Sequence, residues 1–273
     1  MEKKKSFITT KRILTLKKEN PYFSSYITAI TELNRIYWTT KLSKDLIYEY
    51  REKLKLNTVV SIEIELPSVN GSEITKERQK GKVSDILKKA MRYDIFASSI
   101  VSSVTVVESY LESVIKRLYL KHPNKLTISL TKEDKEEEKN ISIKSILNAT
   151  SLEDLYKEVI DKKILRIMYL SPKEYFMSIK KTFGFNLEDE LVDTFIEIKA
   201  TRDLIVHSGG RVNSYYINKS GVKCRVTDTK QIIPLDIDYL LCSMVCMKKL
   251  ITEIYKETSR IYLKKTKKSE LFP

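Results

Sequence analysis

The stretch VSDILKKAMRYDIFASSIVSSVTVVESYLESVIKRLYLK, residues 83–121, has the longest helical pattern in the sequence. Apolar side chains recur along it at intervals of three, four and seven residues, and the pattern ends just before Pro123. These side chains are Ala90, Ala97, Val101, Val104, Leu111, Ile115 and Leu118. The spacing predicts one long amphipathic helix that buries this stripe.

Two carboxylates, Asp94 and Glu108, fall on the same apolar stripe. A buried carboxylate is costly unless it has a positive or hydrogen-bonding partner. Glu108 is therefore expected either to form a structural ion pair or to lie near an active site.

Patterns of the same kind predict most of the remaining chain to be helical. The expected helices cover residues 22–55, 152–169, 173–181, 187–206 and 235–261. Gly209 and Gly210 are expected to end the fourth of these helices, and Ser171-Pro172 to begin the third. Charge-rich residues 124–140 are expected to be a solvated excursion.

Strand patterns are short and few. Residues 57–66 alternate apolar and charged side chains over their second half and stop at Pro67, which predicts a strand. Residues 212–218 and 221–226 suggest two short β segments around a turn. Residues 67–82 have the composition of a linker. The predicted fold is mainly α: a helical bundle over 81–265 with a small β-hairpin appendage, an N-terminal α/β extension over 1–80, and a basic tail over 266–273.

The composition excludes several common chemistries. The chain of 273 residues has no GxGxxG or GxxxxGK[ST] loop, two histidines and three cysteines without metal-ligand spacing. We therefore expect no metal and no cofactor, and reduced core cysteines of a cytoplasmic protein. No window is apolar enough for a membrane span.

The net charge of +14 is unevenly distributed. Residues 1–18 carry seven basic residues against one acidic residue, and residues 260–273 carry five against one. Residues 198–225 carry six against one. Solvated tails are as compatible with this distribution as contact with nucleic acid.

The segment IKATRDLIVHSGGR, residues 198–211, combines an arginine with a histidine. Arg202 lies on the apolar stripe of its helix, which suggests Glu108 as its carboxylate partner. His207 follows five residues later, about 140° around an ideal helix, so the two meet either at a frayed helix end or across a two-fold axis. A helix-terminal histidine that only interacts with the helix dipole is the alternative.

Such a pair suits cleavage of RNA through the ribose 2′-OH. Histidine can move the proton, and arginine can stabilise the crowded phosphorane without a metal ion. The neighbouring Lys199 and Arg211 are candidate phosphate contacts. Tyr215 and Tyr216 are candidate platforms for base stacking, although tyrosines in β-strands more often pack on a core.

On these residues the chain resembles the HEPN superfamily, the higher eukaryotes and prokaryotes nucleotide-binding domains. Residues 202–207, RDLIVH, resemble its Arg-x4–6-His motif, and SGGRVNSYY is similar to the sequence that often follows. The early helix with VVESYLE, which contains Glu108, also fits, and the resemblance covers roughly residues 84–260.

The resemblance implies a dimeric helical bundle with two motifs in one composite cleft. It implies cleavage of single-stranded RNA to a 2′,3′-cyclic phosphate, in a toxin–antitoxin or antiphage system with a possible antitoxin or defence partner. His207 and Arg202 would be catalytic, with Glu108 and Asp203 supporting them. The residue after the arginine is often asparagine in that family, and Asp203 adds a negative charge there.

Two other functions fit the same residues. A non-catalytic RNA-binding or partner-sensing module would hold RNA in the same cleft without cutting it. In a purely structural protein, Arg202 and Glu108 would be a core ion pair and the basic tails would only aid solubility. Binding and cleavage of RNA distinguish the three.

Overall fold

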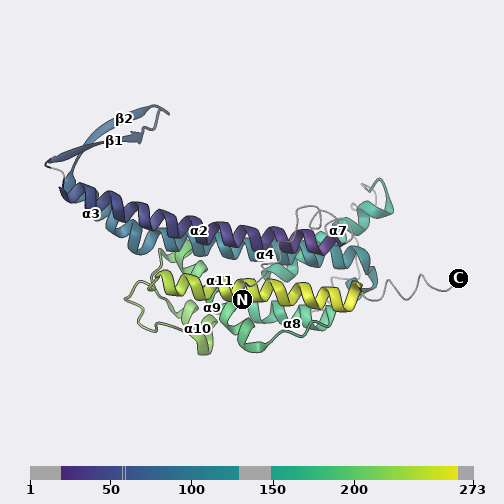
Figure 1. Cartoon of the computed structure of the whole chain (residues 1–273). Coiled ribbons are helices and arrows are strands. Elements are labelled where there is room, and N and C mark those ends of the chain that lie inside the picture. The colour runs from purple at the N-terminus through teal and green to yellow at the C-terminus, as the bar shows by residue number, and fades with distance from the viewer. Residues whose placement is uncertain (1–19, 57, 59, 129–148, 264–273) are drawn as a thin grey trace, which may run out of the picture.

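The computed structural model describes residues 20–56, 58, 60–128 and 149–263. It is mostly helical, as predicted, and three long helices run side by side along the molecule (Figure 1). They are α2 (Pro21–Leu56), α4 (Ile95–Lys121) and α11 (Ile237–Thr258). No helix of the described chain is both long and apolar enough to cross a membrane.

The predicted long helix over 83–121 is confirmed, with one irregularity. Helix α3 (Lys80–Lys89) continues into α4 through a π-helical turn, Ala90–Asp94. A π turn holds an extra residue and therefore rotates the helix face on one side of it relative to the other. The apolar stripe is accordingly buried from Ala97 to Leu118, except for the half-buried Val101, whereas Ala90 and Asp94 are only half-buried.

Helix α2, which the sequence assigns to an N-terminal extension, packs against α4 and α11. Its side chains Tyr22, Leu33 and Ile36 belong to the same hydrophobic core as the helices that follow. The predicted boundary between the N-terminal extension and the helical domain, at residues 80–81, lies at the end of a β-hairpin over residues 61–79. Helix α2, before that boundary, shares one hydrophobic core with the helices after it.

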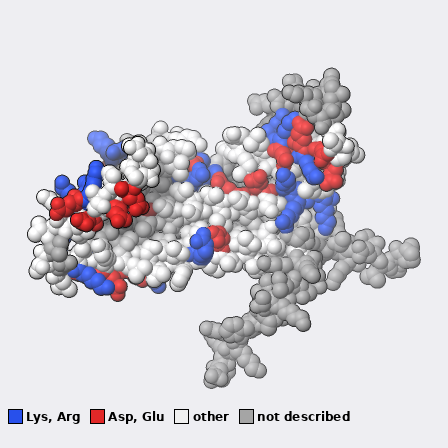
Figure 2. Space-filling model, turned by 90° about the horizontal axis from the view of Figure 1, so that it is seen from above, with Lys and Arg blue, Asp and Glu red and all other residues white. Residues whose placement is uncertain are grey.

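An antiparallel hairpin projects from the far end of α2 and α3 (Figure 1). Strand β1 (Ser61–Pro67) confirms the predicted strand, but the predicted linker is wrong because Glu73–Gln79 forms β2. The sequence of β2, EITKERQ, has no apolar alternation because all of its residues are exposed. Lys, Arg, Asp and Glu side chains gather over the hairpin in Figure 2.

The helices between α4 and α11 agree with the sequence for the most part. They are α7 (Leu152–Tyr169), α8 (Pro172–Phe183) and α9 (Asp189–Ser208). Ser171 and Glu174 form a capping box at the predicted start of α8. After α4 the chain makes a 3-10 turn, Pro123–Thr127. Most of the predicted excursion over 124–140 lies outside the described residues, and so does most of each basic tail.

The two β segments predicted after α9 are wrong. Residues Ser214–Ser220 form the short helix α10, and a 3-10 turn, Gly221–Lys223, follows it. The reason is a helix cap: the Asn213 side chain accepts a hydrogen bond from the backbone N–H of Tyr216 at 2.9 Å. Arg211 and Ile232 form one isolated bridge, so the β appendage of this bundle lies at 61–79.

The end of α9 depends on two glycines in the left-handed backbone region. Gly209 has φ 56° and Gly210 has φ 78°, and the Gly210 N–H donates to the Leu204 carbonyl at 2.9 Å. Gly210 also lies directly under Tyr93, so that a Cβ there would overlap the Tyr93 hydroxyl. This contact joins the end of α9 to the π turn before α4.

Substitutions at the two glycines separate the cost of the positive φ from the cost of the contact with Tyr93. Gly209→Ala meets no neighbour and should lose only about 1 kcal/mol of unfolding free energy, from its positive φ. Gly210→Ala adds the overlap and should lose about 3 kcal/mol. Urea unfolding measures both, and Tyr93→Phe should restore part of the Gly210→Ala loss. Equal losses at the two glycines would contradict the contact.

Candidate nucleic-acid interface

Helix α9 carries four of the predicted site residues, but it pairs them differently from expectation. Glu108 on α4 forms its ion pair with Lys199, so the predicted Glu108–Arg202 pair is wrong. The reason is the antiparallel packing of the helices, which aligns Tyr93 with Gly210 and Glu108 with Lys199, about one turn before Arg202.

Arg202 is half-buried and pairs with its neighbour in the sequence. Its Nη1 donates to Asp203 Oδ1 at 3.0 Å. Its Nε is buried, and none of the described residues accepts a hydrogen bond from it. Because buried donors are almost always satisfied, this guanidinium has unused capacity for an acceptor.

Asp203 joins Arg202 to a second cation, Lys219 of α10. Lys219 Nζ donates to Asp203 Oδ2 at 2.7 Å, and the Asp203 and Lys219 side chains are only 17% and 12% exposed. Burial by itself would raise the pKa of Asp203, but the hydrogen bonds and charges of Lys219 and Arg202 outweigh it and lower that pKa. The carboxylate is therefore ionised at neutral pH.

His207 is exposed in the last turn of α9, ahead of Gly209. Tyr215 on α10 is 63% exposed, and Lys219 Nζ lies 5.1 Å from the centroid of its ring. Arg211 is also exposed and donates to the Lys230 carbonyl at 3.2 Å. His207, Arg211 and Tyr215 thus remain accessible to a ligand.

The prediction that Tyr216 stacks on a base is wrong. Tyr216 is 0% exposed, and its hydroxyl donates to Glu197 Oε1 at 2.8 Å. The Asn213 cap turns this side chain inward, away from solvent. Burial and the nearby Glu197 charge raise the pKa of Tyr216 to about 12, so it stays neutral.

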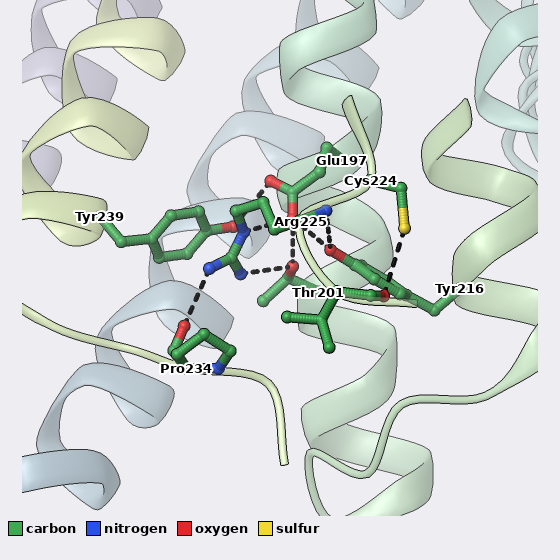
Figure 3. A network of polar contacts seen from close by, with 8 residues as sticks. Glu197, Thr201, Tyr216, Cys224, Arg225, Pro234 and Tyr239 are labelled. Carbon is green, nitrogen blue, oxygen red and sulfur yellow. Dashed lines mark hydrogen bonds and ion pairs between the residues drawn. The ribbon is translucent and has the colours of Figure 1, made fainter. Parts of the chain in front are cut away.

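Glu197 is the centre of a buried polar network that was not predicted from the sequence (Figure 3). It lies on α9 and is 4% exposed. Its carboxylate accepts hydrogen bonds from Thr201 and Tyr216 at 2.8 Å, from Arg225 Nε at 2.8 Å and from Tyr239 at 3.0 Å. The one available signal was a glutamate between apolar neighbours in the sequence FIEI, residues 195–198.

Arg225 extends this network to the loop before α11 (Figure 3). Its Nη1 donates to the Pro234 carbonyl at 2.8 Å and its Nη2 to the Thr201 hydroxyl at 3.2 Å. Its guanidinium carbon lies 3.6 Å from the centroid of the Tyr239 ring, a cation–π arrangement. The network therefore joins α9, α10, the 221–236 loop and α11.

Ion pairs also change the meaning of the basic segment 198–225. Five of its six basic residues pair with an acidic residue. The pairs are Lys199–Glu108, Arg202–Asp203, Lys219–Asp203, Lys223–Glu190 and Arg225–Glu197. The charge count alone therefore overstates the attraction that this segment exerts on RNA.

The cysteines follow the core expectation only in part, since Cys246 is buried, Cys224 half-buried and Cys242 exposed. Within the described ranges, no group of three or more histidine, cysteine or acidic side chains could hold a metal ion.

The fold and site together define a mostly helical protein with a cluster of cations, an exposed histidine and an exposed tyrosine where α9 meets α10. No protein-family model, curated protein or solved structure matches the chain.

Arg225 should be essential for stability. Arg225→Met keeps the aliphatic stem but leaves the buried Glu197 charge without a counter-ion, so the free energy of unfolding should fall by about 3 kcal/mol. Urea unfolding measures the change. Lys223→Met is the matched control, because its partner Glu190 is exposed and the change should be small.

Adding Glu197→Gln to Arg225→Met removes the stranded charge and should recover part of the loss. Equal stability of the Arg225→Met and Lys223→Met proteins would contradict the role of the network.

Proposed function

We propose that this protein is an HEPN-type, metal-independent endoribonuclease that cuts single-stranded RNA by attack of the ribose 2′-OH. One observation carries the proposal: the exposed His207 ends the helix on which the half-buried Arg202 has a guanidinium N–H without an acceptor among the described residues. A proton carrier and an anion-binding group thus occupy the same helix end.

The chemistry divides between these two side chains. An imidazole can both accept and donate a proton, so His207 can take the 2′-OH proton or return one to the leaving oxygen. Arg202 stabilises the negative charge that develops on the phosphorane. In the free protein Asp203 holds Arg202 in place through the 3.0 Å hydrogen bond, and Glu108 pairs with Lys199 about one turn earlier on α9.

The complete site needs a second copy of the chain. Arg202 and His207 lie about 140° apart around α9, so one helix does not direct both side chains at the same atom. A two-fold axis close to the end of α9 brings the motif of one copy beside that of its partner. The proposal therefore includes a cytoplasmic homodimer, with RNA as substrate and an antitoxin or defence protein as a further partner.

A second function has an observation of its own. Arg202 already has a carboxylate partner in the free protein, and this pairing suits a module that binds RNA or senses a partner without cutting. RNA binding without products would support this function over cleavage.

Incubation with transfer RNA and total RNA in a metal chelator tests the proposal. The wild-type protein should produce fragments with 2′,3′-cyclic phosphate ends, and His207→Ala and Arg202→Ala should each reduce the rate at least about 100-fold while the dimer persists. Gel analysis of the RNA gives the rates, and light scattering gives the oligomeric state.

His122→Asn is the matched control. His122 is the other histidine of the chain. It packs against Tyr262 in a tilted arrangement, with ring centroids 4.5 Å apart, at the end of α4 away from Gly210. Its loss should leave cleavage intact. Cleavage in chelator by the His207→Ala protein at the wild-type rate would overturn the proposal.

A further inference from the structure

We infer that Asp203 occupies the position of an RNA phosphate in the free protein, and that Arg202 and Lys219 form the two-cation site which that phosphate enters when Asp203 is displaced. The inference rests on the proposed function and deepens it, because it names Lys219 and Tyr215 as further binding residues. In the free protein the side chain of Asp203 fills the phosphate site.

The Asp203 carboxylate is bound as a phosphate would be. Each oxygen of Asp203 is held by a different cation: Oδ1 by Arg202 Nη1 at 3.0 Å and Oδ2 by Lys219 Nζ at 2.7 Å. A phosphodiester likewise spreads one negative charge over two non-bridging oxygens. The two donors that satisfy Asp203 can therefore satisfy a phosphate in the same way.

Arg202 keeps one N–H group that Asp203 does not use. The Asp203 carboxylate engages Nη1, whereas Nε has no acceptor among the described residues. A guanidinium binds phosphate best through two N–H groups in its fixed fork. Asp203 therefore satisfies Arg202 incompletely, and an incoming phosphate has a hydrogen bond to gain.

Lys219 lies outside the Arg-x4-His motif, but the fold places it beside Asp203. Helix α10 turns back along α9 because Asn213 caps it and Tyr216 anchors it on Glu197. This turn brings Lys219 to Asp203 and leaves the side chain only 12% exposed. An amine held this firmly beside Arg202 is positioned for binding before RNA arrives.

Tyr215 gives the site its preference for single strands. Its ring is 63% exposed, and Lys219 Nζ lies 5.1 Å from the ring centroid. A phosphate on Lys219 therefore brings an adjoining base close to this exposed ring. Only an unpaired base can stack there, so the site takes one nucleotide of single-stranded RNA.

The Asp203→Asn substitution distinguishes two roles for Asp203. Asp203 either occupies the phosphate position or only orients Arg202, and the two roles predict different changes in RNA affinity. The substitution keeps the shape of the side chain and removes its charge. If Asp203 only orients Arg202, RNA binding weakens or stays the same. If Asp203 occupies the phosphate position, the competitor is lost and binding tightens.

The test is binding of a fluorescent single-stranded oligoribonucleotide to the full chain in a His207→Ala background, over a range of salt concentrations. Asp203→Asn should lower Kd about tenfold. Lys219→Met should raise Kd and reduce the slope of log Kd against log salt by about 0.7, the value for one lost phosphate contact. Tyr215→Ala should weaken binding of the single strand but not of a duplex.

Two control substitutions make the same changes of charge at residues outside the proposed site. Glu190→Gln removes one negative charge from the same helix, and Lys223→Met removes the lysine that pairs with Glu190. Both should leave Kd and its salt dependence near those of the background protein. Thermal unfolding of every variant shows whether it is folded, and Lys219→Met decides the question if Asp203→Asn does not fold.

Unchanged or weaker binding by folded Asp203→Asn would overturn the inference, as would an unchanged salt slope for folded Lys219→Met. Cleavage is measured separately, with His207 present. If the protein cleaves RNA but the binding changes are absent, the inference is wrong and the proposed function still holds. If the binding changes occur but RNA is not cleaved, the protein has the phosphate site but is not a ribonuclease.

Discussion

The buried carboxylate of Glu197 is the constraint on which the candidate site depends. A charge at this depth is stable only with a full set of donors, and it receives them from three hydroxyl groups and Arg225. These donors come from α9, α10, the loop before α11 and α11 itself. Satisfying one carboxylate therefore fixes four segments relative to one another, and the position of Lys219 follows from it.

Most charges around α9 form ion pairs. Glu108 with Lys199 joins α4 to α9, and Glu197 with Arg225 holds the 221–236 loop. The cluster around Asp203 differs because one carboxylate serves two cations and a guanidinium N–H remains unsatisfied within the described chain. A single anion shared by two cations leaves a local excess of positive charge, which is what a phosphate ligand requires.

Helical periodicity predicted most of the fold because a helix buries a stripe that the sequence displays directly. It failed after Arg211, where valine and tyrosine suggested strands but the Asn213 cap and the burial of Tyr216 produced α10. It also missed β2, whose exposed residues show no pattern. The partner of Glu108 depends on the register between α4 and α9, which periodicity within one helix cannot supply. For the same reason, Lys219 and Glu197 could be located only once the helices were packed.

The most direct measurement is a crystal structure with a short single-stranded RNA made uncleavable by a 2′-deoxy sugar at the scissile position. We expect a phosphate held by Arg202 and Lys219, with Asp203 turned away from both. We also expect a base stacked on Tyr215, and His207 of the same or the partner subunit near the modified sugar. RNA bound elsewhere on the bundle, with the Arg202–Asp203–Lys219 contacts intact, would contradict this expectation.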